Sequence, residues 1–195
     1  MLREIYLALK GRLSHDVAEL RQVDWYLDQF DQYDPEEVVL GTPVALIEFH
    51  PIHWTTLSQN VQKAILTFSV HLATSTAYGD DMDMLDLTYI DHLSIESKIF
   101  VALMNTRFTM PDIQTFLNQQ GLVWTTPDGQ PWTATSKDII LESIVRIDTV
   151  PHRQQSPIIV TEQVFQATIF DYSATPKYKA LHLSLNLQVN IKSNE

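Results

Sequence analysis

The sequence predicts an α+β protein, with a mostly antiparallel sheet and helices packed on one face of it. Two extended apolar runs, 44–49 and 61–72, follow each other closely, and further apolar runs that are typical of strands come late in the chain. Strands joined by short connections pair in antiparallel fashion. Helical spacing occurs at two places without a regular strand-helix alternation, which argues against a doubly wound parallel sheet.

The N-terminal part predicts one helix and one strand. Apolar residues at helical spacing indicate a short amphipathic helix over residues 2–13. Residues 17–30 fit either a helix or a strand, and we favour a strand over 22–28 because this stretch is rich in aromatic and β-branched residues. Residues 31–37 form a polar segment with a proline, which is typical of a loop.

Residues 42–74 predict the central hairpin of the sheet, because run 61–72 alternates with the period of a half-buried strand. One face would carry Leu66, Phe68, Val70 and Leu72, and the other Ile65, Thr67, Ser69 and His71.

Residues 75–87 predict an exposed loop, because they contain a glycine and four aspartates, Asp80, Asp81, Asp83 and Asp86. Helical spacing returns over 91–104, with Asp91 as a candidate N-cap. The apolar stripe of this second helix, which we expect to pack on the same sheet, consists of Ile95, Ile99, Ala102 and Leu103.

The remaining chain predicts an insertion and three strands within a single domain of residues 1–195. Residues 105–138 are the inserted subelement, with a short helix from Pro111 and a small hairpin. Strands are expected over 139–148 and 157–172. The last run, 181–191, alternates without a break, and such an edge strand invites pairing with another chain. We therefore expect a subunit interface at its leucines, Leu181, Leu183, Leu185 and Leu187.

Composition excludes several classes of protein. The chain carries 13 Lys and Arg against 24 Asp and Glu, a formal net charge of −11, and no basic run, so tight wrapping of DNA is disfavoured. Such acidity suits solubility, or a surface past which nucleic acid slides. The absence of cysteine excludes disulfides and thiolate chemistry. No run resembles a signal peptide or approaches a bilayer-spanning length, so we expect a cytoplasmic protein without membrane contacts.

No motif predicts catalysis. His50 and His53 lie near Glu48 and are conceivable metal ligands, but the spacing fits no standard site, and surface or turn histidines are favoured. The aspartates of 75–87 lack the glycine and glutamate of a calcium loop, so a solvated loop or a negatively charged lining is favoured. The tryptophans, which lack basic neighbours, predict core or interface anchors. We expect neither an enzyme nor a bound cofactor or metal.

The order of elements resembles the tail-terminator and tail-completion proteins of long-tailed bacteriophages and prophages. The similar segments cover most of the chain except 105–138. They are LREIYLALKGRL, VDWYLDQF, PVALIEFHPIHW, QKAILTFSVHLAT, the acidic segment, IESKIFVALMN, ILESIVRIDTV and IIVTEQVFQATIFDY.

This resemblance implies an α+β subunit that forms a ring, typically a hexamer, at the end of the tail tube or at the head-tail junction. Its partners would be its own copies, tail-tube protein and connector protein, with DNA passing through the lumen unbound. It would occur first in the host cytoplasm and then in the virion tail. The acidic segment would face the lumen or a partner. The alternatives are an adaptor of similar fold that forms no closed ring, and a metal-dependent enzyme.

Overall fold

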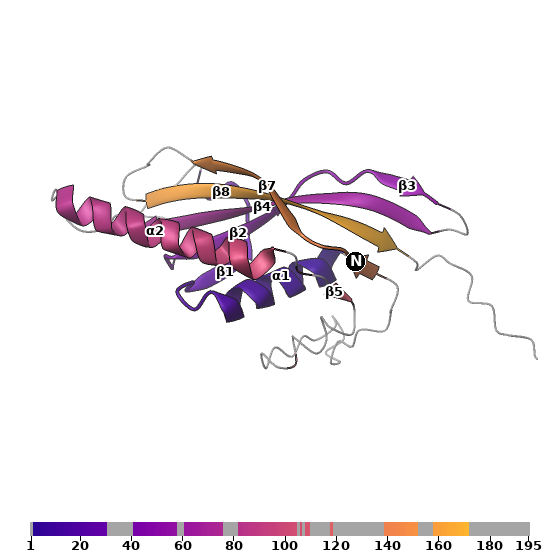
Figure 1. The fold of residues 1–195 in the computed structure, drawn as a ribbon, viewed down its shortest axis with the longest axis horizontal. Coiled ribbons are helices and arrows are strands. Elements are labelled where there is room, and N and C mark those ends of the chain that lie inside the picture. Colours follow the sequence, from indigo (N-terminus) through magenta and orange to yellow (C-terminus); the bar gives the residue numbers. More distant parts are fainter. Residues whose placement is uncertain are drawn as a thin grey trace, which may run out of the picture.

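The computed structural model describes residues 2–30, 41–57, 61–75, 82–104, 106, 108–109, 118, 139–151 and 158–171. Within these ranges the chain forms two helices and one eight-stranded sheet (Figure 1). The α+β class predicted from the sequence is therefore confirmed. In chain order the elements are α1 (Leu2–Asp16), β1 (Gln22–Trp25), β2 (Val44–Phe49), β3 (Trp54–Thr56), β4 (Gln62–Ser75), α2 (Met82–Leu103), β5 (Phe108–Thr109), β6 (Ile139–Leu141), β7 (Val145–Pro151) and β8 (Ile158–Asp171).

Two long antiparallel strands form the centre of the sheet. β4 and β8 are 14 residues each and pair along their whole length, from Gln62 opposite Asp171 to Ser75 opposite Ile158. On the other side of β4 lie β2 and β3, and beyond β8 lie β6 and β7, all in antiparallel pairs. Only the pair β1–β2 is parallel among the described strands. The predicted mostly antiparallel sheet is confirmed, and the two runs of 42–74 pair in antiparallel fashion as β2 and β4. The predicted hairpin is not the centre of the sheet, however, because β8 pairs along β4, and β3 lies in the connection between β2 and β4.

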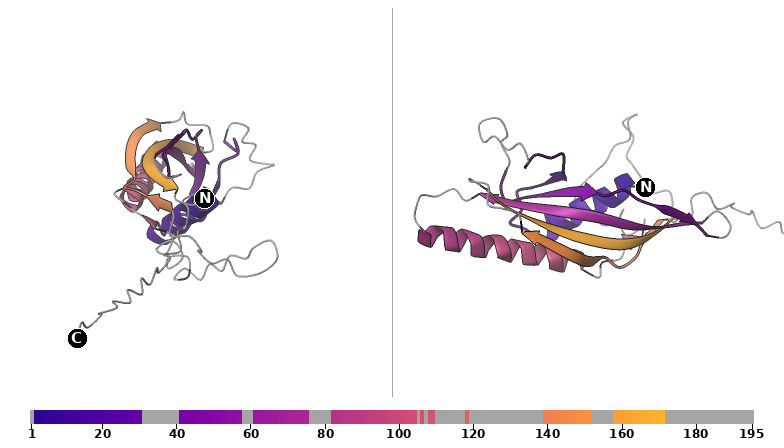
Figure 2. Two further views of the ribbon diagram at one scale, coloured as in Figure 1. Left: turned by 90° about the vertical axis from the view of Figure 1, so that its right-hand side faces the viewer. Right: turned by 90° about the horizontal axis from the view of Figure 1, so that it is seen from above.

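Both helices pack on the same face of the sheet, as predicted. The largest buried cluster combines Ile5 and Leu9 of α1, Ile99 of α2, and the predicted inner face of β4. At its centre Phe68 of β4 and Phe165 of β8 stack with ring centroids 5.4 Å apart, and both side chains are fully buried. Figure 2 shows in its left view that the sheet curves, so that β7 comes round toward α2.

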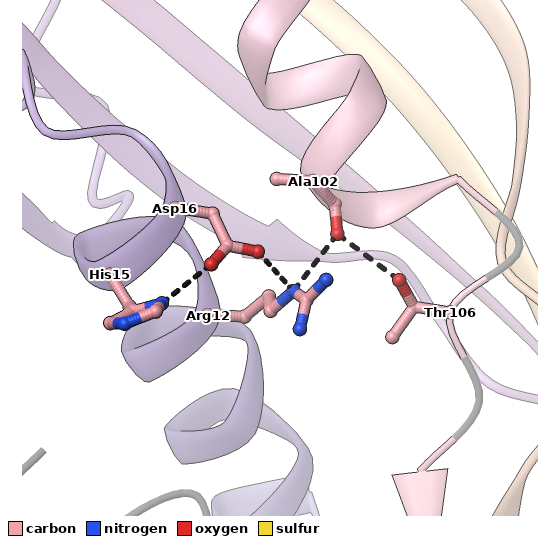
Figure 3. A network of polar contacts seen from close by, with 5 residues as sticks. All are labelled: Arg12, His15, Asp16, Ala102 and Thr106. Carbon is pink, nitrogen blue, oxygen red and sulfur yellow. Dashed lines mark hydrogen bonds and ion pairs between the residues drawn. The ribbon is translucent and has the colours of Figure 1, made fainter. Parts of the chain in front are cut away.

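A polar junction ties the two helices together at the end of α2 (Figure 3). The Arg12 guanidinium donates from Nε to the backbone oxygen of Ala102 at 3.2 Å and lies 2.5 Å from Asp16 Oδ2. Thr106 Oγ1 donates to the same carbonyl at 3.1 Å. Carbonyls in the last turn of a helix lack intrahelical donors, so Arg12 caps α2 and at the same time holds α1 beside it.

The acidic segment is the main point at which the predicted secondary structure is wrong. α2 begins at Met82, so Asp83 and Asp86 belong to a helix and not to an exposed loop, while Asp80 and Asp81 lie outside the described residues. Asp91 lies inside the helix and is not its N-cap. Carboxylates near a helix N-terminus interact favourably with the helix dipole, so a run of aspartates is compatible with a first turn.

Several strand boundaries also differ from the predictions. The expected strand 139–148 is divided into β6 and β7, and β1 ends at Trp25 instead of continuing to 28. Within the predicted insertion, residues 108–109 form β5 at the edge of the sheet, in a pair with β6. The other residues of 105–138, except 106 and 118, the predicted loop 31–37 and the predicted strand 181–191 lie outside the described residues.

Candidate functional site

The face of the sheet away from the helices, which we call the open face, is buried over part of its area. Tyr26 and Phe30, which follow β1, pack over Val44, Leu46 and the adjoining ends of β4 and β8. The half-buried character predicted for 61–72 therefore holds only for its first part. Ile65 is 53% exposed, whereas Ser69 and His71 are buried at 0% and 5%. Their partners on neighbouring strands explain how polar side chains are accommodated there.

A hydrogen-bonded chain on the open face joins β8, β4 and His50, which directly follows β2. Ser69 Oγ on β4 donates to Glu162 Oε1 on β8 at 2.5 Å. Because the hydroxyl has only one proton, it accepts the hydrogen bond from His50 Nε2, which lies 2.7 Å away. A serine nucleophile needs the opposite polarity, with the histidine taking the serine proton. The arrangement links three neighbouring segments of the open face.

A second pair lies beside this chain of hydrogen bonds. His71 Nε2 is 2.9 Å from Glu48 Oε2, and the ring of Tyr26 stacks on His71 with centroids 3.9 Å apart. The sequence analysis grouped Glu48 with His50 and His53, but the structure pairs Glu48 with His71 and leaves the His53 side chain exposed. No group of three His, Cys, Asp or Glu in the described part of the chain could hold a metal ion.

We expect Ser69→Ala to lower the free energy of unfolding by about 2 kcal/mol, because it removes the donor to Glu162 and the acceptor for His50 in a buried place. Urea denaturation of the purified protein measures this loss. Ser94→Ala, at an exposed position of α2, is the matched control and should change the value by less than about 0.5 kcal/mol. Equal stability of the two variants would contradict the network.

Polar contacts also attach α2 to the sheet. His92, which is fully buried, lies between Thr74 Oγ1, 2.8 Å from its Nδ1, and Thr161 Oγ1, 2.6 Å from its Nε2. Burial lowers the pKa of His92 from 6.5 to about 4. One turn further, Gln163 Nε2 donates to the backbone oxygen of Glu96 at 2.8 Å. The region of α2 around His92 is therefore held by hydrogen bonds as well as by apolar packing.

An exposed apolar surface lies along one edge of the sheet, and we call it the β7 margin. It consists of β7 and the flank of α2 that faces it. Its exposed apolar side chains, with exposed fractions from 37% to 51%, are Tyr89 and Leu93 on α2 and Val145, Ile147 and Val150 on β7. Val145 and Val150 lie opposite Gln166 and Glu162 and therefore point to the open face, whereas Tyr89 and Leu93 lie on the helix side.

Arg146 connects the two parts of the β7 margin. Its guanidinium carbon lies 4.1 Å from the ring centroid of Phe100, and its NH1 lies 3.8 Å from Glu96 Oε1. Burial raises the pKa of Glu96, and the charge of Arg146 opposes this shift. Residues 89, 93, 96 and 100 recur at helical spacing, so they share one flank of α2. The contacts of Arg146 show that this flank faces β7.

β7 is an edge strand in the described sheet, where it pairs only with β8. An edge strand presents a row of backbone N–H and C=O groups to a possible partner strand. The ladder has an irregularity between Arg146 and Asp148, beside the exposed Ile147. The β7 margin thus combines backbone hydrogen-bonding groups with apolar side chains, which is the combination that strand addition requires.

The predicted site residues are placed only in part. Of the acidic residues, Asp83 and Asp86 lie in α2, and the predicted interface leucines of 181–191 lie outside the described residues. Trp25 is 37% exposed and makes a tilted ring contact with Tyr6 and an edge-on contact with Phe49, while Trp54 packs against the main core. The sequence analysis missed the β7 margin. The available signal was Tyr89 and Leu93, which lie four residues apart and outside the predicted apolar stripe.

Comparison with known families and curated proteins identifies no relative of this chain. No family model matches the chain, and a search of curated proteins finds no similar sequence. Among the described residues no helix is long and apolar enough to cross a membrane.

Proposed function

We propose that this chain is a structural subunit of a bacteriophage or prophage tail, which assembles with its own copies into a ring. The ring would end the tail tube or join it to the head connector, and DNA would pass through the lumen without specific binding. The subunit would be made in the host cytoplasm and become part of the virion. Its role would be assembly and not catalysis, without a cofactor.

The β7 margin is the observation that carries this proposal. Side chains with the exposure of Tyr89, Leu93 and Ile147 form an apolar surface beside an edge strand, and such a surface favours contact with another protein. A closed ring requires a contact between two different surfaces of each subunit. The α+β fold is the one that the resemblance implies, and a formal net charge of −11 suits a conduit through which DNA slides.

We expect the full chain to form a ring of about six copies, either alone at high concentration or with tail-tube protein of the same phage. Light scattering after size exclusion, followed by negative-stain imaging, measures the species. Ile147→Asp should keep the protein monomeric, because it places a charge in the β7 margin.

Leu57→Asp is the matched control for this experiment, because Leu57 is 46% exposed but lies beyond β3, outside the β7 margin. This variant should assemble like the unchanged chain. A protein that stays monomeric or dimeric at all concentrations, with tail-tube protein present, would contradict the ring and favour an adaptor of the same fold.

A further inference from the structure

We propose that residues 181–191 of one copy add to β7 of a second copy as an antiparallel strand, with the leucines covering the flank of α2. This inference rests on the proposed function, which identifies the partner as a second copy of the chain. It names both surfaces of the contact between subunits.

β7 is the edge strand best suited to receive a partner. It has 7 residues, whereas β1 has 4, β3 has 3 and β5 has 2. Only β7 among these lies beside an exposed apolar helix flank, at Tyr89 and Leu93. A strand added there gains backbone hydrogen bonds from β7 and side-chain contacts from α2.

The pattern of residues 181–191 matches this one-sided surface. Every second residue is Leu, Val or Ile, and the residues between them are His, Ser, Asn and Gln, without a carboxylate or a lysine. Successive side chains of a strand point to opposite faces. The apolar face of the added strand would therefore cover Leu93 and its neighbours on α2, while the polar face of the added strand would stay in contact with water.

Charge also favours this partner. Lys177 and Lys179 precede the run and Lys192 follows it, whereas the chain as a whole has a formal net charge of −11. In the β7 margin Glu96 is paired with Arg146, and Asp148 is an exposed carboxylate. Lysines at both ends of the run would thus meet an acidic protein, which steers association and reduces repulsion between copies.

Chain geometry favours a second copy over pairing within one chain. A strand antiparallel to β7 begins beside Pro151, which pairs with Thr161 of β8. Thr161 lies about 33 Å along β8 from Asp171, where β8 ends. With Leu185 opposite Thr149, Leu183 lies beside Pro151, and residues 172–182 reach about 40 Å at full extension. The return along β8 and across two strand spacings takes about 35 Å. The same chain would therefore need a nearly stretched linker, and a second copy would not.

Disulfide trapping between copies tests this pairing without background, because the chain contains no cysteine. Thr149 lies opposite Gln163 and faces α2, whereas Val150 lies opposite Glu162 and faces the open face. Two singly substituted full-length proteins are mixed and oxidised, and the disulfide-linked heterodimers are quantified by mass spectrometry.

Thr149→Cys should form a disulfide with Leu185→Cys, and Val150→Cys with Ser184→Cys, because in one antiparallel register the two residues of each pair lie opposite each other and face the same side. The mismatched pair Thr149→Cys with Asn186→Cys should give about tenfold less, since its Cβ atoms point to opposite faces. Leu183→Cys and Leu187→Cys repeat the test at neighbouring registers. Thr55→Cys on the edge strand β3 is the control, and it should not be trapped.

The inference would be overturned if Thr55→Cys gave as much disulfide-linked heterodimer as Thr149→Cys, or if the matched and mismatched pairs gave equal yields. So would a Thr149→Cys, Leu185→Cys double variant that closes only within one chain at every dilution. If the cysteine variants assemble into rings but none of the matched pairs forms a disulfide, the strand addition is wrong and the proposed function still stands. Trapped copies without rings would support the strand addition and overturn the ring.

Discussion

Phe165→Ala is expected to lower the free energy of unfolding by about 4 kcal/mol. Phe165 lies in β8, is fully buried and stacks on Phe68 of β4. β4 and β8 are the two strands on which the rest of the sheet and both helices are assembled. Truncation removes the apolar contacts of one ring and leaves a cavity between strands that are paired over 14 residues and cannot close around it.

Urea denaturation at low protein concentration measures this loss in the free monomer. Leu57→Ala, at a side chain that is 46% exposed, is the control, with an expected loss below about 1 kcal/mol. The double variant Phe68→Ala, Phe165→Ala should depart from additivity by about 1 kcal/mol, because the two rings contact each other. Equal losses for Phe165→Ala and Leu57→Ala would mean that the stacked rings are not the centre of the core.

The central strands could be predicted from the sequence because apolar and polar residues that alternate along a strand point to opposite faces of the sheet. Leu66 and Phe68 were expected on one side of β4, and they are buried under the helices. Phe165 and Ala167 of β8 alternate with less buried residues and lie in the same cluster. In each case a long strand packs one face against helices, so the period of two remains visible in the residue types.

The polar network could not be predicted, because it depends on register. Ser69 and Glu162 lie on β4 and β8, and His50 directly follows β2, so the three side chains meet only through the pairing of these strands. Long connections separate these strands in the chain, and such connections do not determine which residues face each other. A buried serine and a half-buried histidine also look like residues of a solvated face when each segment is considered alone.

The β7 margin was missed for a related reason. The expected strand 139–148 was treated as one apolar segment, whereas the chain divides it between β6, beside the end of β8, and β7, further along the same strand. Helix α2 begins nearer the N-terminus than predicted, at Met82, which brings Tyr89 onto the helix. Only these two differences together create an exposed helix flank beside an edge strand.

Acid should destabilise the protein through His92. The folded pKa of His92, about 4, lies below the ordinary value of 6.5, so the folded state binds its proton less readily than the unfolded state. Above pH 6.5 neither state is protonated and the side chain has no effect on the pH dependence. As the pH falls from 6.5 toward 4, the unfolded state gains a proton first, and about 3 kcal/mol of stability is lost.

His92→Gln isolates this effect from the protonation of carboxylates, which both proteins share. Urea denaturation of both proteins between pH 7 and pH 4 should show that the unchanged chain loses more stability, by up to about 1.4 kcal/mol per pH unit. His53→Gln, at an exposed side chain, is the matched control. Parallel curves for the unchanged chain and His92→Gln would mean that His92 is not buried as a neutral ring.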